Sequence, residues 1–204
     1  MIDFFNELFY QYSQYAVMDI YLEIIAVIFG FCSVWYSKNN NVLVFPTGMI
    51  NTSIFVYLLF KWSLLGDMII NIYYFIMSIY GWFYWRRGNN EKPVAITVIS
   101  NYDKKIIIVL VLSSAFFVSL VYTFFNKWDS FISYIDILTT SIFFAAMWLM
   151  AKRKIESWNF WIIANIISIP LYFYKGLAFT SLQYFIFTLI AIAGYFKWKN
   201  IYNQ

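Results

Sequence analysis

Three asparagines lie inside long apolar stretches of the chain, where a polar side chain is costly and is therefore a candidate for function. These residues are Asn51, Asn71 and Asn165. An amide offers two hydrogen-bond donors and an acceptor, which suits a neutral amide or a sugar hydroxyl on a ligand. The alternative is that an asparagine bonds across two packed helices and only holds them together. For Asn51 both interpretations stay open.

Asn165 has a neighbour that favours ligand contact. Trp161 precedes it by four residues, so the two side chains share one face of a helix. A flat aromatic wall beside an amide suits a planar heterocycle, and the face of an indole also attracts a cationic ring. The alternative for Trp161 is an anchor at the membrane interface.

A further polar stripe runs along the helix expected around Asn71. Asn71, Phe75 and Ser78 fall on one side of that helix, at spacings of four and three residues. Such a stripe is typical of a wall that lines a cavity, and equally of a packing seam between helices. Gln183 and Tyr184 begin the corresponding helix near the end of the chain and are candidates for the opposite wall.

Acidic residues are few. Asp19 and Glu23 are four residues apart and could bind a cation or exchange protons, although a solvated helix end explains them as well. Asp67 suits the N-terminus of a helix, where a negative charge is favourable. Asp136 is the acid expected at greatest depth, but no second acid matches its depth, so an ion-coupling pathway is poorly supported.

Several kinds of catalysis are disfavoured by composition. The chain has no histidine, and Cys32 is its single cysteine. Zinc sites, catalytic triads built on histidine and haem ligation all depend on such residues. We therefore expect no metal, no cofactor and no enzymatic activity.

The elements that must position these residues are membrane-spanning helices. Of 204 residues, 63% are hydrophobic and only 12% charged, about half the charged fraction of a soluble domain. Stretches of about 20 apolar residues match the thickness of the hydrocarbon core. Nine Trp and 18 Tyr, many near the ends of these stretches, fit an interfacial belt. The runs are continuous rather than alternating, which argues against a β-barrel.

We predict seven transmembrane helices in one all-α membrane domain covering residues 1–204. Their expected ranges are Val17–Tyr36, Val42–Phe60, Asp67–Trp85, Ile106–Phe125, Phe131–Ala151, Trp158–Tyr174 and Thr180–Phe196. The second and sixth contain Pro46 and Pro170. Arg87 to Lys105 is expected to form a cytoplasmic linker.

Basic residues predict the orientation of the chain. The first ten residues carry Asp3 and Glu7 but no Lys or Arg, so no secretory signal is expected. Eleven basic residues fall on one side of the predicted spans: Lys38, Arg86, Arg87, Lys92, Lys104, Lys105, Lys152, Arg153, Lys154, Lys197 and Lys199. Only Lys61, Lys127 and Lys175 fall on the other. Positive residues gather inside, so we expect the N-terminus outside and the C-terminus in the cytoplasm.

The sequence also contains an internal repeat. Its landmarks are Trp35, Asn51, Lys61, Gly81 and Trp85 in the first stretch, and Trp148, Asn165, Lys175, Gly194 and Trp198 in the second. The successive separations are 16, 10, 20 and 4 residues against 17, 10, 19 and 4, which single-residue gaps in two loops would reconcile. Chance matching in a Trp-rich chain is the alternative.

A genuine repeat implies a 3+1+3 arrangement of the SWEET-like kind. Residues 17–86 and 131–198 would form two parallel three-helix halves, with a linker helix over 106–125 between them. Transporters with such repeats hold their substrate between the halves, near the middle of the membrane.

The chain resembles a known family at several of these motifs. The residues concerned are Phe45-Pro46-Thr47-Gly48-Met49-Ile50-Asn51, Tyr80-Gly81-Trp82, Trp161-Ile162-Ile163-Ala164-Asn165, Pro170-Leu171-Tyr172 and Lys175-Gly176. Together with the order of the spans they resemble the PnuC family of bacterial vitamin transporters, from about Leu22 to Trp198.

This resemblance implies facilitated diffusion of a vitamin precursor across the bacterial inner membrane. Nicotinamide riboside is the family's best-known substrate, and related members carry thiamin or riboflavin. It also implies a homotrimer, and accumulation through a cytoplasmic kinase that phosphorylates the substrate. Trp161 and Asn165 match the family's ligand-contacting motif. Asn71 stands where a glutamine is expected in nicotinamide riboside carriers, and Phe75 where an asparagine is expected, which leaves the substrate open.

The leading hypothesis is a uniporter for nicotinamide riboside, with thiamin as the alternative substrate. The expected binding residues are Trp161, Asn165, Asn71, Asn51, Phe75, Tyr184 and Gln183. A membrane-embedded enzyme is a second hypothesis, which the absence of histidine disfavours. A third is a membrane scaffold or substrate-binding subunit that does not itself transport. Nothing in the sequence indicates nucleic acid as a partner.

Overall fold

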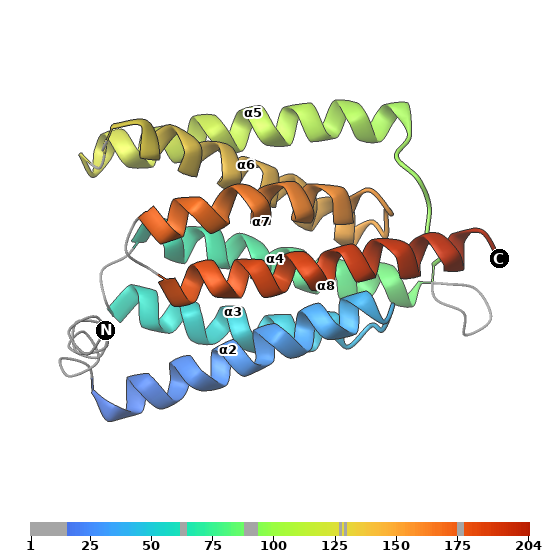
Figure 1. The fold of residues 1–204 in the computed structure, drawn as a ribbon, viewed down its shortest axis with the longest axis horizontal. Coiled ribbons are helices and arrows are strands. Elements are labelled where there is room, and N and C mark those ends of the chain that lie inside the picture. The colour runs from blue at the N-terminus through green and yellow to red at the C-terminus, as the bar shows by residue number, and fades with distance from the viewer. Residues whose placement is uncertain (1–15, 62–64, 88–93, 127, 129, 175–177) are drawn as a thin grey trace.

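The computed structural model describes residues 16–61, 65–87, 94–126, 128, 130–174 and 178–204, and these residues form seven α-helices (Figure 1). The helices are α2 (Val17–Lys38), α3 (Val44–Lys61), α4 (Leu65–Arg86), α5 (Asn101–Phe124), α6 (Ser130–Ala151), α7 (Ser157–Tyr174) and α8 (Ala178–Tyr202). The predicted all-helical fold with seven helices is confirmed. Asp3, Glu7, Lys92, Lys127 and Lys175, which entered the sequence predictions, lie outside the described residues.

Most helix boundaries lie within a few residues of the predicted ones. The largest differences are at the end of α8, which extends to Tyr202 instead of Phe196, and at the start of α5. This helix was expected from Ile106 but begins at Asn101. The hydroxyl of Ser100 accepts a hydrogen bond from the backbone N–H of Asp103, whose carboxylate accepts one from the backbone N–H of Ser100. This capping box satisfies free backbone donors at the first turn and starts the helix early. Lys104 and Lys105 are therefore helical rather than part of a linker.

Four helices are long and apolar enough to cross a membrane by length and composition alone: α2, α3, α5 and the stretch Phe131–Ala151 of α6. A helix of 22 residues spans about 33 Å, close to the hydrocarbon thickness. The remaining helices, α4, α7 and α8, carry the polar residues Asn71, Asn165 and Gln183.

The internal repeat is present with a constant register. The starts of α2, α3 and α4 lie 113 residues before those of α6, α7 and α8, and the ends of the first two helices keep the same spacing. The two loop gaps expected from the sequence do not occur. Asn165 therefore corresponds to Thr52 rather than to Asn51, and Lys61 corresponds to Tyr174.

The two three-helix halves meet along two corresponding interfaces. In each half, neighbouring helices of the chain pack together. Between the halves, α2 packs on α8, and α4 packs on α6. Phe31 of α2 contacts Phe187 of α8 with ring centroids 5.0 Å apart, and Tyr73 of α4 stacks on Phe144 of α6 at 4.0 Å. The linker helix α5 lies at the edge of the bundle and packs mainly against α6 (Figure 1).

Two contacts mark the axis that relates the halves. Ser37 donates a hydrogen bond to the sulfur of Met150 at 3.0 Å, and these residues are 113 positions apart. The guanidinium of Arg153 donates to Oδ1 of Asn40 from Nε at 3.2 Å and from Nη2 at 2.5 Å, at the same separation. A residue that touches its own repeat counterpart must lie on the pseudo-twofold axis. Asn40 and Arg153 also share a left-handed backbone conformation, with φ of 56° and 61°.

The same end of the bundle holds a buried aromatic core with equivalent members from each half. Trp85 packs edge-on against Phe45, and Trp198 packs edge-on against Trp158. Trp85 and Trp198 also each form a hydrogen bond to the other half. Nε1 of Trp85 donates to the carbonyl of Ala151 at 3.2 Å, and Nε1 of Trp198 donates to that of Ser37 at 3.0 Å.

The end of the expected linker is not a free loop. Thr97 pairs with the turn between α6 and α7 through backbone bonds to Arg153 and Ile155, at 3.1 and 3.0 Å. The side chain of Arg153 donates to the carbonyl of Val94 and lies 4.7 Å from the ring of Trp85. Burial in this setting lowers the pKa of Arg153 to about 10, so it remains charged at neutral pH.

Candidate functional site

A cavity of about 610 Å³ lies between the two halves. The residues that line it come from α2, α3, α4, α6, α7 and α8, and among the described residues α5 contributes none. Its size is that of a pocket for a small organic molecule. The repeat thus forms the cavity, while the linker helix stays outside it.

The cavity is open at one end and closed at the other. Asp67, at the start of α4, lines it and is exposed to solvent. At the far end the lining residues Ser37, Phe45, Met150 and Trp158 are at most 4% exposed. The closed end is the one that carries the pseudo-twofold contacts and the aromatic core.

An aromatic wall runs along the second half. Trp161 lies 5.5 Å from Phe143, Phe143 stacks on Tyr184 at 5.9 Å, and Tyr184 lies 5.0 Å from Tyr172, all measured between ring centroids. All four residues line the cavity. Such a wall can hold a flat ring and can attract a cationic one.

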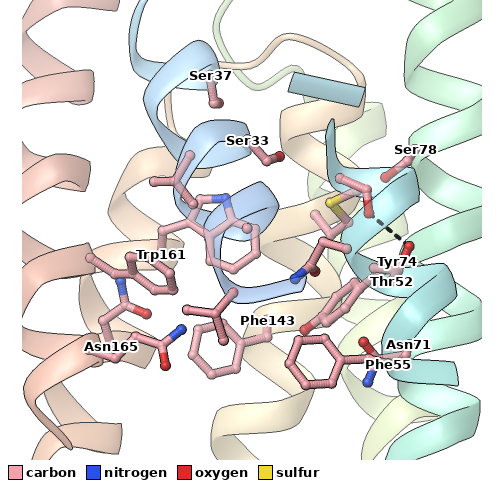
Figure 2. Close-up of a pocket in the computed structure, with 18 of the residues that line it drawn as sticks. Ser33, Ser37, Thr52, Phe55, Asn71, Tyr74, Ser78, Phe143, Trp161 and Asn165 are labelled. Carbon is pink, nitrogen blue, oxygen red and sulfur yellow. Dashed lines mark hydrogen bonds between the residues drawn. The ribbon is translucent and has the colours of Figure 1, made fainter. Parts of the chain in front are cut away.

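The predicted amides reach the cavity in different hydrogen-bonding states. Asn165 is 3% exposed, and among the described residues no hydrogen bond is found to its amide. Asn71 donates from Nδ2 to the carbonyl of Asp67, one turn earlier on the same helix, at 3.0 Å. Figure 2 shows Asn165 and Asn71 on opposite sides of the cavity.

Asn51 has a structural role in addition to its place in the lining. Its Nδ2 donates to the carbonyl of Ala26 at 2.7 Å, and the side chain lies against Gly30. It therefore bonds α3 to α2, which is the alternative that the sequence left open. Only its remaining polar atoms are available to a ligand.

Six of the seven predicted binding residues line the cavity: Trp161, Asn165, Asn71, Asn51, Tyr184 and Gln183. Phe75 is not among the lining residues. On α4 the lining positions are Asp67, Asn71, Tyr74 and Ser78, so the cavity-facing stripe passes through Tyr74. A neighbouring residue is turned by about 100° on a helix, which explains the difference. Whether any of these side chains contacts a substrate remains a prediction.

The acidic residues separate into three settings. Asp19 forms an ion pair with Lys61 at 2.6 Å, which joins the start of α2 to the end of α3. Asp136 accepts a hydrogen bond from the hydroxyl of Tyr122, between α6 and α5. Glu23 and Asp67 line the cavity, and no Lys or Arg in the described part of the chain does so. Among the described lining residues, Glu23 and Asp67 are thus the ones with a charged side chain.

Several lining residues were not predicted from the sequence. One is Trp158, which has a buried indole N–H without a hydrogen-bond partner in the described residues, as does the predicted Trp161. Phe143 and Tyr74 complete the aromatic lining, and Ser33 contributes a hydroxyl. The signal for Trp158 was its three-residue spacing from Trp161, which places the two indoles on neighbouring positions of one helix face.

A bundle of apolar helices, built from two parallel halves around a central cavity, defines a multi-pass membrane protein of the transporter class. The comparisons with known proteins give the family. Residues 20–200 match the family model described as nicotinamide mononucleotide transporter, and the chain belongs to this family. The resemblance expected from the sequence is confirmed, and the family is one of membrane transporters rather than enzymes.

Similar proteins extend over most of the chain. The nicotinamide riboside transporter PnuC of Escherichia coli is 22% identical over 88% of this chain and 85% of its own length. That of Neisseria mucosa is 23% identical over 91% and 74%. The riboflavin/roseoflavin transporter RibM of Streptomyces davaonensis is 23% identical over 60% and 58%.

A solved structure shares the fold. This chain superposes on the crystal structure of the vitamin B3 transporter PnuC with a TM-score of 0.67 and 21% sequence identity. The match covers 92% of this chain and 84% of the PnuC chain. The likeness supports the seven-helix arrangement.

Proposed function

We propose that this protein is a uniporter for a B-vitamin precursor whose ring is cationic, with nicotinamide riboside as the first candidate substrate. The observation that carries the proposal is a cavity with an aromatic wall, amide side chains and two carboxylates, but no lining Lys or Arg among the described residues. A positively charged aromatic ring satisfies all of these features together. The names of the relatives from Escherichia coli and Neisseria mucosa point to the same compound.

Within the cavity, Trp161 would stack on the ring, and Asn165 and Asn71 would bond to amide or hydroxyl groups. Trp161 is held at its position by Phe143, and Asn165 follows it by one turn of α7. The buried N–H groups of Trp158 and Trp161 supply two further donors. Gln183 and Tyr184 close the wall from α8.

The charge of the cavity also separates the bare vitamin from its phosphate ester. A phosphate group needs Arg, Lys or backbone N–H groups to balance its charge. The lining offers Glu23 and Asp67 instead. Phosphorylation by a cytoplasmic kinase would therefore prevent the return of the substrate and convert downhill transport into accumulation.

Transport would proceed by rocking of the two halves. With the N-terminus outside, as the distribution of basic residues predicts, the open end with Asp67 faces outward and the closed end faces the cytoplasm. The interfaces α2–α8 and α4–α6 would then slide or open. We further propose a homotrimer in the bacterial inner membrane, which follows from the family resemblance. The exposed apolar face of α5 would contact lipid or another copy.

Thiamin is the second candidate, because it too is an aromatic cation with a hydroxyl. Asn71, which is shorter than the glutamine expected for nicotinamide riboside carriers, leaves this alternative open. Riboflavin, the substrate in the name of the relative RibM, is uncharged and would gain nothing from Glu23 and Asp67.

The proposal is tested with purified protein by binding of nicotinamide riboside, thiamin and riboflavin, followed by counterflow in liposomes. Trp161→Ala should weaken binding of the cationic vitamin by about thirtyfold, because a buried cation–π contact contributes about 2 kcal/mol. Asn165→Ala should weaken it by about tenfold. Trp35→Ala and Asn159→Ala are matched controls, since both residues are exposed and lie outside the cavity lining.

If the Trp161 and Asn165 variants bind every vitamin as well as the unmodified protein, the site assignment is wrong. If the protein binds a vitamin but gives no counterflow, it is a substrate-binding scaffold. Chemical change of the vitamin would instead reveal an enzyme.

A further inference from the structure

The first half of the bundle contains a small polar niche around Gly48 that the proposed site does not use. A Cβ atom at Gly48 would lie 3.2 Å from the hydroxyl oxygen of Ser33 and 3.4 Å from that of Ser78. The three residues come from α3, α2 and α4, and all three line the cavity. Even a methyl group at Gly48 would thus be in tight contact with both hydroxyls, and its absence leaves them accessible from the cavity.

The two hydroxyls differ in their hydrogen bonds. Ser33 donates to the backbone carbonyl of Val44 at 2.7 Å, so its oxygen remains available as an acceptor. Ser78 is 3% exposed, and the described residues supply no partner for its hydroxyl. A hydroxyl that lines a cavity and has no hydrogen bond within the protein is available to a ligand or to water. Together they offer one free donor and two acceptors.

The repeat shows that this niche is specific to one half. At the constant spacing of 113 residues, the counterparts of Ser33, Gly48 and Ser78 are Ala146, Trp161 and Ala191. Ala146 and Ala191 are buried and have no polar side-chain atom. At matching positions, therefore, one half presents the side chain of Trp161 and the other presents Gly48 beside two hydroxyls.

Figure 2 places Ser33 and Ser78 toward one end of the cavity, with Asn165 and Asn71 toward the other. On α4, Ser78 follows Asn71 by seven residues, which is about 10 Å along the helix axis. The niche is thus closer to the closed end than the amides are, and it is separate from them.

We propose that this niche is a second subsite that binds the hydroxyl-bearing substituent of the substrate while the ring lies against Trp161. This inference rests on the proposed function and adds to it. The substrate class becomes an aromatic cation that carries at least one hydroxyl group on a substituent. A ring without such a group would leave the Ser78 hydroxyl unpaired and would bind less tightly.

The test compares two ligands with the same cationic ring. Nicotinamide riboside carries hydroxyls, and 1-methylnicotinamide carries none. Binding is measured with the purified full chain and with Ser33→Ala and Ser78→Ala. Each substitution should weaken binding of nicotinamide riboside about three- to tenfold, the range for a neutral hydrogen bond, and should change that of 1-methylnicotinamide less than about twofold. Thiamin and its analogue without the hydroxyl form a second pair.

The matched control is Ser114→Ala. Ser114 lies on α5 outside the cavity lining, is 4% exposed, and bonds to its own helix at the carbonyl of Leu110. It should alter binding of neither ligand. Gly48→Ala provides a second variant, because its methyl group would fill the niche and should weaken the riboside more than the methylated ring.

Two results overturn the subsite while leaving the proposed function intact. In one, the Ser33, Ser78 and Gly48 variants weaken both ligands of a pair equally, which indicates general packing. In the other, they leave both unchanged. If the unmodified protein binds neither pair, the proposed function itself fails and the subsite fails with it.

Discussion

At the scale of single residues, two glycines determine how closely the third helix of each half approaches the second. A Cβ atom on Gly81 would lie 2.2 Å from the ring of Phe45, and one on Gly194 would lie 2.6 Å from the ring of Trp158. Both rings are fully buried, with Phe45 packed against Trp85 and Trp158 packed against Trp198. Neither ring can move aside without displacing the aromatic core at the closed end.

Gly81→Ala should therefore lower the free energy of unfolding by about 1–3 kcal/mol, the usual effect of overpacking a core. Thermal unfolding in detergent measures the change. Adding Phe45→Leu to the Gly81→Ala variant should restore part of the stability, because the smaller side chain leaves room for the new methyl group. An unfolding temperature unchanged by Gly81→Ala would show that the core is looser than the contact distances indicate.

The sequence predicted candidate residues well where a polar group interrupts an apolar helix, as at Asn71 and Asn165. It could not decide what such a group bonds to, and the bond of Asn51 to the Ala26 carbonyl depends on the neighbouring helix. It also missed the niche at Gly48. Small residues such as Gly48 do not indicate a binding site until they are compared with their counterparts in the other half. The comparison of Gly48 with Trp161 requires the repeat spacing of 113 residues.

At the scale of elements, the closed end of the cavity is held by contacts between the halves. Trp85 and Trp198 each donate to a carbonyl near the end of the first helix of the other half. Asn40 and Arg153 meet on the pseudo-twofold axis, as do Ser37 and Met150. Opening the cavity on this side requires that all of these contacts separate.

A cross-link at this point should block transport. Cys32 is the single cysteine, so Cys32→Ser gives a background without thiols. In that background, Ser37→Cys with Met150→Cys places two thiols across the axis. A short, reducible cross-linker should abolish counterflow, and reduction should restore it. Each single-cysteine variant serves as a control. Full counterflow in the cross-linked protein would mean that the halves do not separate here.

Helix boundaries and the repeat register show where sequence reasoning falls short for elements. Hydropathy located each helix, but α5 starts five residues earlier than predicted because hydrogen bonds between Ser100 and Asp103, rather than apolarity, begin it. The repeat was recognised through Trp and Gly landmarks. Its register was set one residue off at Asn51 and Lys61, because residue identity was matched where the equal lengths of the helices and loops decide the correspondence.

At the scale of the whole molecule, charge is divided between the outer surface and the cavity. Net charge is +4, yet the cavity lining contains Glu23 and Asp67 and, in the described part of the chain, no basic residue. The basic residues gather instead at helix ends and in connecting segments, where the lipid headgroups are. The charged side chains of the described lining are thus acidic although the protein itself is cationic.

This division predicts selectivity by charge. Nicotinamide mononucleotide should bind at least about tenfold more weakly than nicotinamide riboside, because its phosphate meets carboxylates instead of basic groups. Asp67→Asn combined with Glu23→Gln should reduce this difference by weakening the riboside and improving the mononucleotide. Binding titrations of both compounds at constant ionic strength provide the measurement. Equal affinity of the unmodified protein for the two would show that the carboxylates do not act on the ligand.

The contact of Asn40 with Arg153 also has an evolutionary consequence. In a dimer of identical three-helix chains, a residue on the twofold axis meets a copy of itself. Two arginines would repel there, and two asparagines would lack the cation that now bonds to the Val94 carbonyl and lies over Trp85. The present pair therefore requires two halves of different sequence, which a fused chain provides because α5 connects the halves and each can diverge. A second example of such divergence is Gly48, which lies beside two hydroxyls in the first half and corresponds to Trp161 in the second.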